Sequence, residues 1–275
     1  MAIKTPLKWV GSKVRLMPQL RDHLPEGKRL VEPFAGSCAV MMNTDYDEYL
    51  IADVNPDLIG FYRAAAAEPS ALIERAQHLF ALFNTEHGYY DSRDSFNHDD
   101  DPEWRPALFL YLNRHGFNGL CRYNKDGQFN VPYGKYKKPY FPEAEIKAFA
   151  GKAKRANFVC ASYSATLDMV RDGYDVVYCD PPYLTESANF TAYHSAGFNH
   201  MDQGRLARKL RRLARKGISV VASNSDLEMV RHLYAGFDFV QVNAPRSVGA
   251  SATSQKVAAE LILKSPLDSV VKASA

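Results

Sequence analysis

The sequence predicts an α/β fold in which short buried strands alternate with helices. A run of apolar, mostly β-branched residues at 175–179 is typical of a buried strand, and it leads directly into Asp180. A second short strand, at 29–32, leads through a bend at Gly36 into a helical pattern, and a third strand ends in Asp53. In open α/β sheets ligands bind at the carboxyl ends of strands, so these three strand ends form the candidate site.

Composition is that of an ordinary globular protein. The chain has 275 residues, of which 46% are hydrophobic and 24% are charged, enough for one large domain or a domain with an insertion. The formal net charge is only +3, so any surface that binds nucleic acid must be a patch and not the whole molecule.

Cysteine usage and hydropathy favour a cytoplasmic protein. The four cysteines are scattered and include no Cys-x-x-Cys pair, which argues against zinc and against a disulfide framework. The N-terminus lacks an apolar leader, and no apolar run is long enough to span a membrane. We therefore expect no metal and no membrane, and a location in the cytoplasm of a prokaryote or of a virus that infects one.

The stretch from Asp180 to Tyr183 carries the most specific chemistry. Pro181 and Pro182 fix two φ angles and remove two amide hydrogens, which makes the loop stiff. The Asp180 carboxylate and the Pro181 carbonyl can each accept one hydrogen of an exocyclic amine, while Tyr183 stacks on the base. Acceptors that hold these hydrogens out of the ring plane restore the lone pair of the amine and direct it at an electrophile. A rigid turn with a solvated aspartate is the alternative.

The opening stretch places two lysines and a tryptophan around a glycine. It reads Lys8-Trp9-Val10-Gly11-Ser12-Lys13. Such a loop can lay an indole against a flat ligand and bring lysines to an anion. From this stretch alone, an arm that packs its tryptophan into the core is the favoured interpretation.

Gly36 and Asp53 form a pattern typical of nucleotide binding. Gly36 lets a ligand approach the backbone closely, and the N-terminus of the following helix supplies amide donors. An acid at the end of the second strand is the arrangement that binds ribose hydroxyls. Asp53 could instead cap a helix, but Asn55 and Pro56 already supply an N-cap and a first helical residue.

The middle of the chain predicts a helical region followed by a long polar loop. The segment 55–84 has a helical pattern, and a later helix ends near Arg114. The loop at 115–138 interleaves Asn, Arg, Lys and aromatic residues with glycines. Arginine reads guanine bidentately, polar side chains hold phosphates, and exposed aromatic rings wedge between bases. A nucleic-acid-binding loop is predicted, with a turn-rich hairpin as the alternative.

The C-terminal half continues the alternation of helices and strands. The expected elements are a helix at 142–153, strands at 156–160 and 218–222, and a terminal hairpin of 237–242 and 257–263 that encloses a loop with Arg246.

A basic helix at 204–216 has Leu206, Leu210 and Leu213 on one face. We expect it to be a solvated outer helix, with a DNA-facing role as the alternative. The polar and aromatic loop at 189–194 could close over a flipped base, and the histidines His194 and His200 are weak candidates for a general base.

Six motifs occur in order along the chain. They are Lys8-Trp9-x-Gly11-x-Lys13, Glu32-Pro33-Phe34-x-Gly36, Asp53-x-Asn55, Asn113-Arg114-x-Gly116-Phe117-Asn118-Gly119-Leu120-x-Arg122, Phe129-Asn130-Val131-Pro132 and Asp180-Pro181-Pro182-Tyr183. With this ordered set, the chain from about Leu7 to Leu263 resembles the Dam-type DNA adenine methyltransferases, which use S-adenosylmethionine and act on GATC. The resemblance implies a Rossmann-like S-adenosylmethionine-dependent methyltransferase sheet, formed by 1–54 and 148–275. A helical and loop target-recognition domain would be inserted at 55–147.

The resemblance also implies roles by position. The catalytic residues would be Asp180, Pro181, Pro182 and Tyr183. Those around S-adenosylmethionine would be Trp9, Gly11, Lys13, Phe34, Gly36, Asp53, Ser162, Tyr163 and Asp180. The DNA-binding residues would be the base-reading Lys8, Leu120, Arg122 and Pro132, the aromatic wedge Phe117 with its neighbour Asn118, and the phosphate-contacting Arg93, Arg114, Asn124, Asn130 and Lys135. The chain departs from the family pattern at Cys38 and Ser12, which both stand in place of a glycine.

The implied function is site-specific adenine methylation of double-stranded DNA by a monomer, through base flipping and direct in-line transfer. Such enzymes serve DNA replication or restriction-modification. Two alternatives stay open: the same chemistry on the cytosine amine, and a DNA-binding relative without turnover. Methylation of a cytosine ring carbon is disfavoured, because it needs a nucleophilic thiol and the chain has no Pro-Cys pair.

Overall fold

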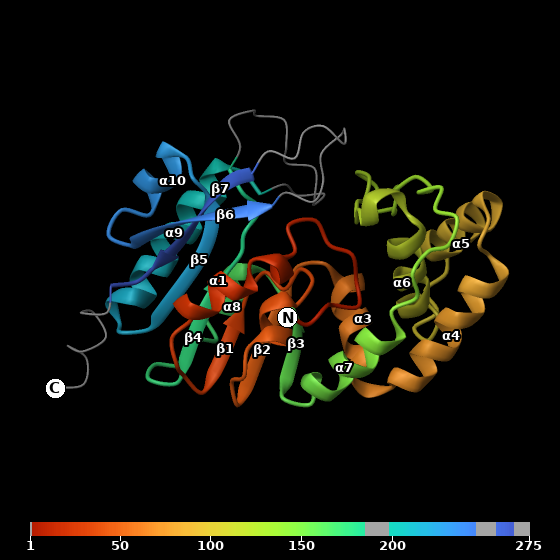
Figure 1. Ribbon diagram of the computed structural model, residues 1–275, viewed down its shortest axis with the longest axis horizontal. Helices are drawn as coiled ribbons and strands as arrows, with labels where there is room; N and C mark the ends of the chain where they lie inside the picture. The colour runs from red at the N-terminus through yellow and green to blue at the C-terminus, as the bar shows by residue number, and fades with distance from the viewer. Residues whose placement is uncertain (1, 185–197, 246–256, 267–275) are drawn as a thin grey trace.

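A single mixed sheet lies beside a helical lobe in the computed structural model, which describes residues 2–184, 198–245 and 257–266 (Figure 1). Within these ranges seven strands are ordered β3-β2-β1-β4-β5-β7-β6. Their bounds are β1 Arg29–Glu32, β2 Glu48–Asp53, β3 Ala156–Cys160, β4 Asp175–Cys179, β5 Ser219–Ser225, β6 Asp238–Pro245 and β7 Val257–Lys264. The five strands from β3 to β5 are parallel, so the carboxyl ends of β1, β2 and β4 meet at one edge. The predicted α/β class is confirmed.

The last strand in the chain lies inside the sheet and not at its edge. The predicted terminal hairpin forms, and Val240 of β6 pairs with Ile262 of β7. However, β7 also pairs antiparallel with β5, where Ser225 lies opposite Glu260. Sequence patterns alone did not predict this insertion. It brings Glu260 to the carboxyl end of β5. This lies next to the edge where β1, β2 and β4 end, which carries the predicted catalytic residues and is named here the catalytic edge.

Helices cover the sheet and form the lobe (Figure 1). In the first half they are η1 Lys13–Arg15, α1 Met17–Leu20, η2 Arg21–His23, α2 Ala39–Asn43, α3 Pro56–Ala67, α4 Pro69–Leu82, α5 Glu86–His98, α6 Arg105–His115 and η3 Phe117–Gly119. In the second half they are α7 Glu143–Ala153, α8 Tyr163–Leu167, α9 His200–Arg215 and α10 Glu228–Leu233.

Two helical regions differ from what the sequence predicted. The segment 55–84 is two helices, because Pro69 has no amide hydrogen to continue α3 and instead begins α4. Helix α5 was not predicted, because its sequence is mostly polar and offers few apolar residues for a core-facing side.

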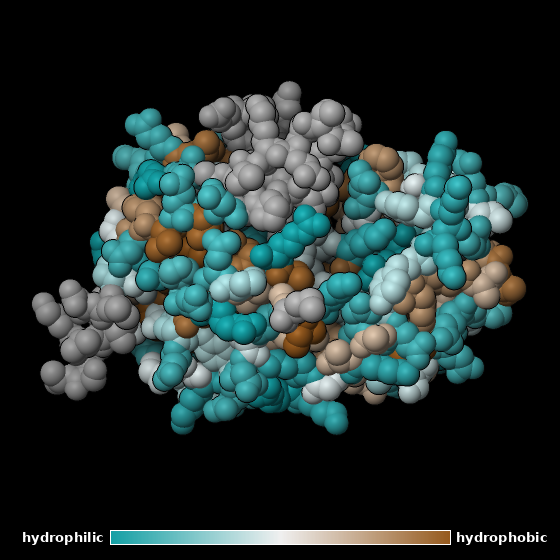
Figure 2. Space-filling view, viewed as in Figure 1, coloured by the Kyte–Doolittle hydropathy of each residue, from teal (hydrophilic) through white to brown (hydrophobic). Residues whose placement is uncertain are grey.

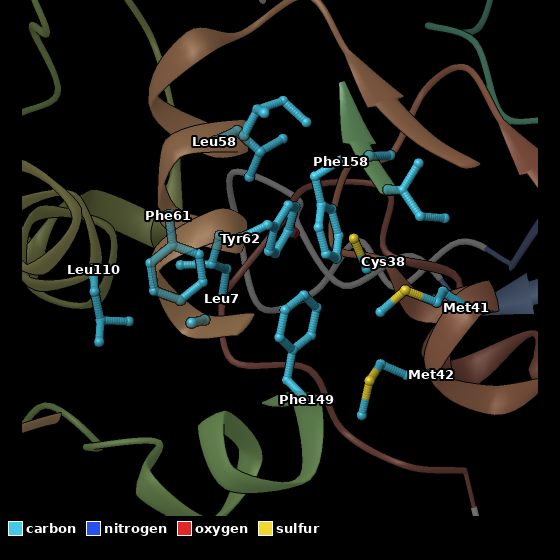
Figure 3. Packing of buried hydrophobic residues seen from close by; sticks show 14 of the residues in the cluster. Leu7, Cys38, Met41, Met42, Leu58, Phe61, Tyr62, Leu110, Phe149 and Phe158 are labelled. Atoms are coloured by element: carbon cyan, nitrogen blue, oxygen red, sulfur yellow. The ribbon is translucent and has the colours of Figure 1, made fainter. Parts of the chain in front are cut away.

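Aromatic side chains join the sheet to the helical lobe (Figure 3). The ring of Tyr62 in α3 lies 5.1 Å from Phe149 of α7 and 5.7 Å from Phe158 of β3. Its neighbour Phe61 lies 6.3 Å from Phe109 of α6. All five residues belong to one buried cluster, so the core is continuous from β3 to α6. The division at 55–147 into a catalytic domain and an insertion stays a prediction.

The second buried cluster lies where α9 packs against β4 and β5. Leu206, Leu210 and Leu213 of α9 are buried there, as their helical spacing predicted. The opposite side of α9 is polar and exposed. The face shown in Figure 2 is largely hydrophilic, with apolar residues in small groups. No helix within the described ranges is long and apolar enough to cross a bilayer.

Candidate active site

Residues 180–183, which are predicted to be catalytic and are named here the catalytic loop, follow the fully buried strand β4 at the carboxyl edge of the sheet. Oδ2 of Asp180 lies 2.7 Å from Nζ of Lys13, and the two side chains are only 21% and 7% exposed. Oδ1 of Asp180 is buried and has no hydrogen-bond partner among the described residues. Burial raises the pKa of Asp180, and the positive charge of Lys13 opposes that rise. This carboxylate therefore has one oxygen in an ion pair and one without a partner.

Lys13 contacts the catalytic loop directly, although the resemblance implies a place at the cofactor. Its ammonium donates to the carbonyl of Gly11 at 2.8 Å and lies 4.9 Å from the ring centre of Tyr183. With the ion pair to Asp180, these contacts place the Lys13 ammonium between the carboxylate and the tyrosine ring.

Tyr183 is held from the other side by a residue that sequence analysis missed. Its hydroxyl donates to Oε2 of Glu260 at 2.9 Å. Glu260 also raises the pKa of Asp180 through its negative charge. The only signal in the sequence was one acid within the apolar run of β7. This pairing fixes the direction of the Tyr183 ring.

The rest of the catalytic loop rests on α9. Nε2 of Gln203 donates to the carbonyl of Pro182 at 2.7 Å, and Gln203 is completely buried. Oε1 of Gln203 accepts from Asn224 and from Tyr234, both at 3.3 Å. The carbonyl of Pro181 accepts no hydrogen bond from the described residues, so it is available to a ligand.

Gly36 and Asp53 come together at the ends of β1 and β2. Oδ2 of Asp53 accepts from the amide of Gly36 at 3.2 Å, and Oδ1 accepts from the amide of Asn55 at 3.0 Å. Gly36 has a φ of 46°, and a Cβ there would lie 3.1 Å from Nε1 of Trp9. The hydroxyl of Tyr62 donates to the Gly36 carbonyl at 2.5 Å. Trp9 thus packs on the glycine turn, and the turn is fixed from three sides.

Cys38 adopts a glycine-like backbone, at a position where the resemblance leads us to expect a glycine. Its φ is 56° and its ψ is 30°, in the left-handed region, and its side chain is fully buried. The hydroxyl of Ser12, at the other position where a glycine is expected, lies 2.8 Å from that of Ser37. The turn therefore accommodates both side chains.

An aromatic group lies beside the catalytic edge near β1 and α8. The rings of Phe34 and Tyr163 stack with centroids 5.5 Å apart, and Phe198 meets both edge-on. Ser162 caps α8 by accepting from the amide of Ala165 at 3.3 Å. The predicted cofactor residues Phe34 and Tyr163 are thus in contact with each other, and Phe198 is an addition that the sequence did not indicate.

Glu32 ends β1 with a buried carboxyl group. Its Oε1 has no hydrogen-bond partner among the described residues. Burial raises the pKa of Glu32 to about 8, and the nearby charge of Asp180 contributes to the rise. Two buried carboxyl oxygens without partners among the described residues therefore lie at the ends of the adjacent strands β1 and β4. One belongs to Glu32 and the other to Asp180.

Residues 117–135, named here the recognition loop, lie next to Lys8. Asn113 donates to the Lys8 carbonyl at 2.7 Å and accepts from the Lys8 amide at 2.9 Å, so it clamps the backbone of Lys8. A Cβ at Gly119 would collide with the Lys8 side chain. The Lys8 ammonium lies 4.1 Å from the ring centre of Tyr136, and burial lowers its pKa.

Arg122 is held by Asn130 across the recognition loop. Its Nε donates to Oδ1 of Asn130 at 2.7 Å, and Nη2 donates to the Asn130 carbonyl at 3.0 Å. A guanidinium fixed in this way has its direction set before any ligand arrives. Asn130, predicted as a phosphate contact, is in this structure a partner of Arg122.

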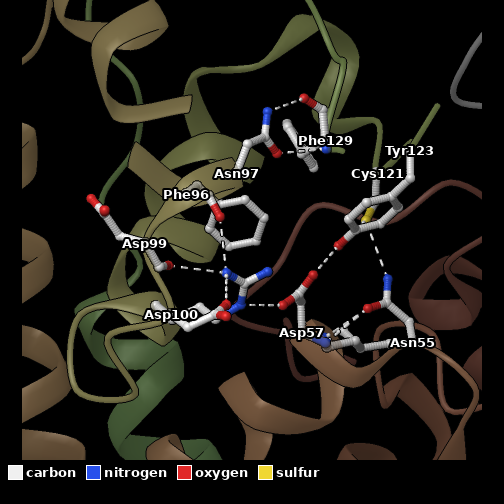
Figure 4. A network of polar contacts seen from close by, with 11 residues as sticks. Asn55, Asp57, Phe96, Asn97, Asp99, Asp100, Cys121, Tyr123 and Phe129 are labelled. Atoms are coloured by element: carbon white, nitrogen blue, oxygen red, sulfur yellow. Dashed lines mark hydrogen bonds and ion pairs between the residues drawn. The ribbon is translucent and has the colours of Figure 1, made fainter. Parts of the chain in front are cut away.

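A polar network fastens the recognition loop to α3 and α5 (Figure 4). Asp57 accepts from Nε of Arg105 at 2.7 Å and from the hydroxyl of Tyr123 at 2.6 Å. Asn97 accepts from the amide of Phe129 at 2.7 Å and donates to its carbonyl at 3.1 Å. The loop thus has a defined shape although it contains little regular structure.

Two predicted phosphate contacts have internal roles. Arg114 is only 6% exposed, and its guanidinium donates to the carbonyl of Pro6. Burial lowers the pKa of Arg114 to about 10. Asn124 closes a turn by accepting from the amides of Asp126 and Gln128, at 3.0 and 2.9 Å. The contacts of both side chains in this structure are therefore internal, and a role for them at a phosphate stays a prediction.

The remaining predicted DNA-binding residues are at least partly accessible. Phe117 is 48% exposed, and Asn118, Pro132 and Lys135 are also exposed. Leu120 and Arg93 are half-buried, and Arg93 donates to the Val131 carbonyl at 3.2 Å. His200 is exposed at the start of α9. The predicted loop at 189–194, with His194, and the predicted Arg246 lie outside the described residues.

No cluster of three or more potential metal ligands occurs in the part of the chain that the structure describes. The catalytic edge therefore consists of carboxyl groups, one lysine, backbone carbonyls and aromatic rings.

Comparisons with known proteins identify the family of the chain. Residues 9–248 match the family model of the D12 class N6 adenine-specific DNA methyltransferases. The Retron Ec67 DNA adenine methylase of Escherichia coli is 52% identical, over 94% of this chain and 90% of that protein. The DNA adenine methylase of Vibrio cholerae is 48% identical, over 93% of this chain and 94% of that protein. The DNA adenine methylase of Escherichia coli K12 is 44% identical, over 93% of each chain. The chain therefore belongs to the D12 class of N6 adenine-specific DNA methyltransferases.

Proposed function

We propose that this adenine-specific DNA methyltransferase uses S-adenosylmethionine and acts on the adenine of GATC in double-stranded DNA. The observation that carries the chemistry is the catalytic loop, where Asp180 and the Pro181 carbonyl offer two acceptors beside the ring of Tyr183. The GATC target rests on the resemblance of the motifs and on the DNA adenine methylases that match nearly the whole chain.

The carboxyl edge of the sheet suits S-adenosylmethionine. Asp53 and the turn at Gly36 offer a carboxylate and close backbone access, and the unpartnered oxygens of Glu32 and Asp180 can accept from amino or hydroxyl groups. The residues that would hold it are Trp9, Gly11, Lys13, Phe34, Gly36, Asp53, Ser162 and Tyr163. When bound, S-adenosylmethionine supplies a methyl group on a sulfonium ion, the electrophile for direct in-line attack by the adenine amine.

The target adenine leaves the helix and enters the catalytic loop, because its amine is out of reach inside a duplex. Asp180 and the Pro181 carbonyl accept its two amino hydrogens, and Tyr183 stacks on the ring. The ammonium of Lys13 holds Oδ2 of Asp180, which leaves Oδ1 to accept from the amine. The negative charge of Asp180 stabilises the positive charge that develops on the amine.

The recognition loop reads the sequence around that adenine. Lys8, Leu120, Arg122 and Pro132 face the bases, and Phe117 fills the gap left by the flipped base. Arg93 and Lys135 bind phosphates. The buried Arg114 positions the N-terminal arm, and the half-buried Asn124 and Asn130 position the recognition loop.

Methyl transfer from labelled S-adenosylmethionine tests the proposal, with duplexes that differ only at GATC and with the product base identified by mass spectrometry. We expect N6-methyladenine in GATC alone. Methyladenine at another sequence would overturn the GATC assignment, and N4-methylcytosine would overturn the choice of base. Failure of every duplex to accept a methyl group, despite intact DNA binding, would favour a relative without turnover. We also expect a monomer, which sedimentation can check.

A further inference from the structure

The exposed face of α9 carries a stripe of arginines that the proposed reaction does not use. Arg208, Arg212 and Arg215 are all exposed. Their spacings of four and three residues place them along one face of the helix. None of the three has a carboxylate within ion-pair distance in the described parts of the chain. We refer to these three residues as the arginine stripe.

Other basic residues of α9 have structural roles. Nζ of Lys209 binds the carboxylate of Asp168 at 2.8 Å and the carbonyl of Ser164 at 2.6 Å. Nη2 of Arg211 donates to the carbonyl of Leu233 at 3.1 Å. These bonds fasten α9 to α8 and α10 on its two sides. The arginine stripe lies between them, and none of its three side chains has a hydrogen bond or an ion pair with another described residue.

The stripe begins close to the catalytic loop. Gln203, in the first turns of α9, donates to the carbonyl of Pro182 at 2.7 Å. Arg208 follows little more than one turn later, and the helix then runs away from the catalytic edge towards the start of β5. DNA that extends beyond the target site on this side of the sheet would meet the stripe.

The stripe is electrostatically unfavourable on its own. Like charges four residues apart, as in Arg208 and Arg212, destabilise a helix, and solvated faces usually mix both signs. The only acid in α9 is Asp202, which lies in the first turn and pairs with Arg205 at 3.1 Å. An anionic partner would remove the repulsion that the protein itself leaves in place.

Duplex DNA suits the stripe better than a membrane does. A basic amphipathic helix binds membranes by inserting its apolar face, but Leu206, Leu210 and Leu213 of α9 are buried in the core. From Arg208 to Arg215 the helix rises about 10.5 Å. One DNA strand carries about three phosphates over that length. We propose that the arginine stripe binds the phosphates of duplex DNA that flanks the target site.

This contact is independent of sequence, and it adds to the binding of DNA by the recognition loop. It therefore lengthens the stay of the enzyme on DNA between transfers. The proposal needs DNA as the substrate, which the family provides, but it does not depend on GATC or on base flipping.

The test compares two triple variants with the same change in net charge. One replaces Arg208, Arg212 and Arg215 with Gln. The control replaces Arg21, Lys28 and Lys154 with Gln, three exposed cations far from the catalytic edge and without ion pairs in the described residues. Binding to a duplex of about 40 base pairs without GATC is measured by fluorescence anisotropy between about 50 and 200 mM salt, a range in which lost phosphate contacts are visible.

We expect the stripe variant to reduce the slope of log affinity against log salt by about 2.7, since each phosphate contact contributes about 0.9. Between about 50 and 200 mM salt, the fold loss of DNA affinity should therefore be about 40 times smaller for the stripe variant than for the wild type. The control should keep the wild-type slope. A variant with Lys at all three stripe positions keeps the charge and should restore it, which separates phosphate binding from misfolding.

Equal slopes for the stripe variant and the control would overturn the proposal and leave the stripe as a solvated face. An unchanged slope together with lost binding to vesicles that contain phosphatidylserine would overturn it in favour of a membrane. Methyl transfer to a duplex of about 12 base pairs should not change in the stripe variant, since so short a duplex has no flanking DNA. A large loss of transfer there would place the arginines at the active site and contradict a flanking contact.

Discussion

The ammonium of Lys13 lies 2.7 Å from Oδ2 of Asp180, on the carboxylate that is proposed to receive the adenine amine. Both side chains are largely closed to solvent, so the lysine controls the charge of Asp180 directly. The same ammonium lies over the Tyr183 ring. Oδ1 of Asp180 has no partner among the described residues, so the base can bind while Lys13 keeps its contact to Oδ2.

Removing the charge of Lys13 should change the pH dependence of methyl transfer. In Lys13→Met the burial that raises the pKa of Asp180 remains, but the charge that opposes it is gone. We expect the acid limb of the single-turnover rate to move to higher pH, because the active carboxylate is lost earlier as the pH falls. Lys13→Arg keeps the charge and should keep the limb. An unmoved limb in Lys13→Met would show that the ion pair does not set the ionisation of Asp180.

Glu32 should make the protein less stable as the pH rises. Its pKa is raised from 4.5 to about 8 by burial, so the folded chain keeps a proton that the unfolded chain releases. The contribution of Glu32 to stability is present in full below pH 4.5. It is lost progressively as the pH rises from 4.5 to about 8. Glu32→Gln removes this titration. We expect the free energy of unfolding in urea, measured at several pH values, to change in favour of the variant over the wild type. The change should be about 1 kcal/mol per pH unit in that window. A constant difference between the two proteins would mean that Glu32 is ionised in the folded state.

The left-handed backbone of Cys38 should favour glycine over alanine. A residue with a Cβ costs about 1–2 kcal/mol in this region, whereas glycine costs about 0.4–1 kcal/mol through its freedom in the unfolded chain. We expect Cys38→Gly to be more stable than Cys38→Ala by about 0.5–1 kcal/mol, as measured by denaturant unfolding. Both variants lose the sulfur, so the comparison isolates the backbone. Equal stability would show that this turn relaxes when the side chain is shortened.

Glu260 should act through Tyr183. Loss of the hydrogen bond in Glu260→Ala frees the tyrosine ring, and a bond to a charged group is worth about 1.5–3 kcal/mol. We expect the single-turnover rate to fall about 10- to 100-fold while the affinity for DNA stays near the wild-type value. Tyr183→Phe combined with Glu260→Ala should be little worse than either change alone, because they remove the same bond. Multiplicative losses in the double variant would argue that Glu260 acts on Asp180 instead.

Asn130 should influence sequence choice through Arg122. Without the Asn130 side chain the guanidinium loses its 2.7 Å partner and keeps only the 3.0 Å bond to the backbone carbonyl of residue 130, so its direction is less restricted. Asn130→Ala and Arg122→Ala are both expected to reduce discrimination at the same base pair by about 1–3 kcal/mol. Methylation rates on duplexes with single substitutions in GATC give this value. A uniform loss across all duplexes in Asn130→Ala would instead support its original assignment as a phosphate contact.

Much of the catalytic edge was predictable from local sequence. A short β-branched strand followed by an acid identified Asp180, and a strand ending in an acid after a glycine turn identified Asp53. These features depend only on neighbouring residues and on the rule that ligands bind at the carboxyl ends of parallel strands. The helical span 55–84 failed in detail because one proline, Pro69, restarts the helix.

Contacts between distant residues were not predictable in this way. Glu260 reaches Tyr183 only because β7 lies between β5 and β6, a fact of sheet order and not of the residues around Glu260. The resemblance implied a phosphate contact for Arg114, and the structure shows its guanidinium buried against the Pro6 carbonyl. Burial decides between such roles, and burial depends on the whole fold.

The catalytic loop takes its two charged neighbours from distant parts of the sequence, Lys13 from η1 and Glu260 from β7. Synthesis runs from the N-terminus, so the catalytic loop and the recognition loop are both made before β7 exists. Tyr183 gains its hydrogen bond to Glu260 only when β7 pairs between β5 and β6. The insertion of β7 is therefore the folding step that completes the support of the catalytic loop.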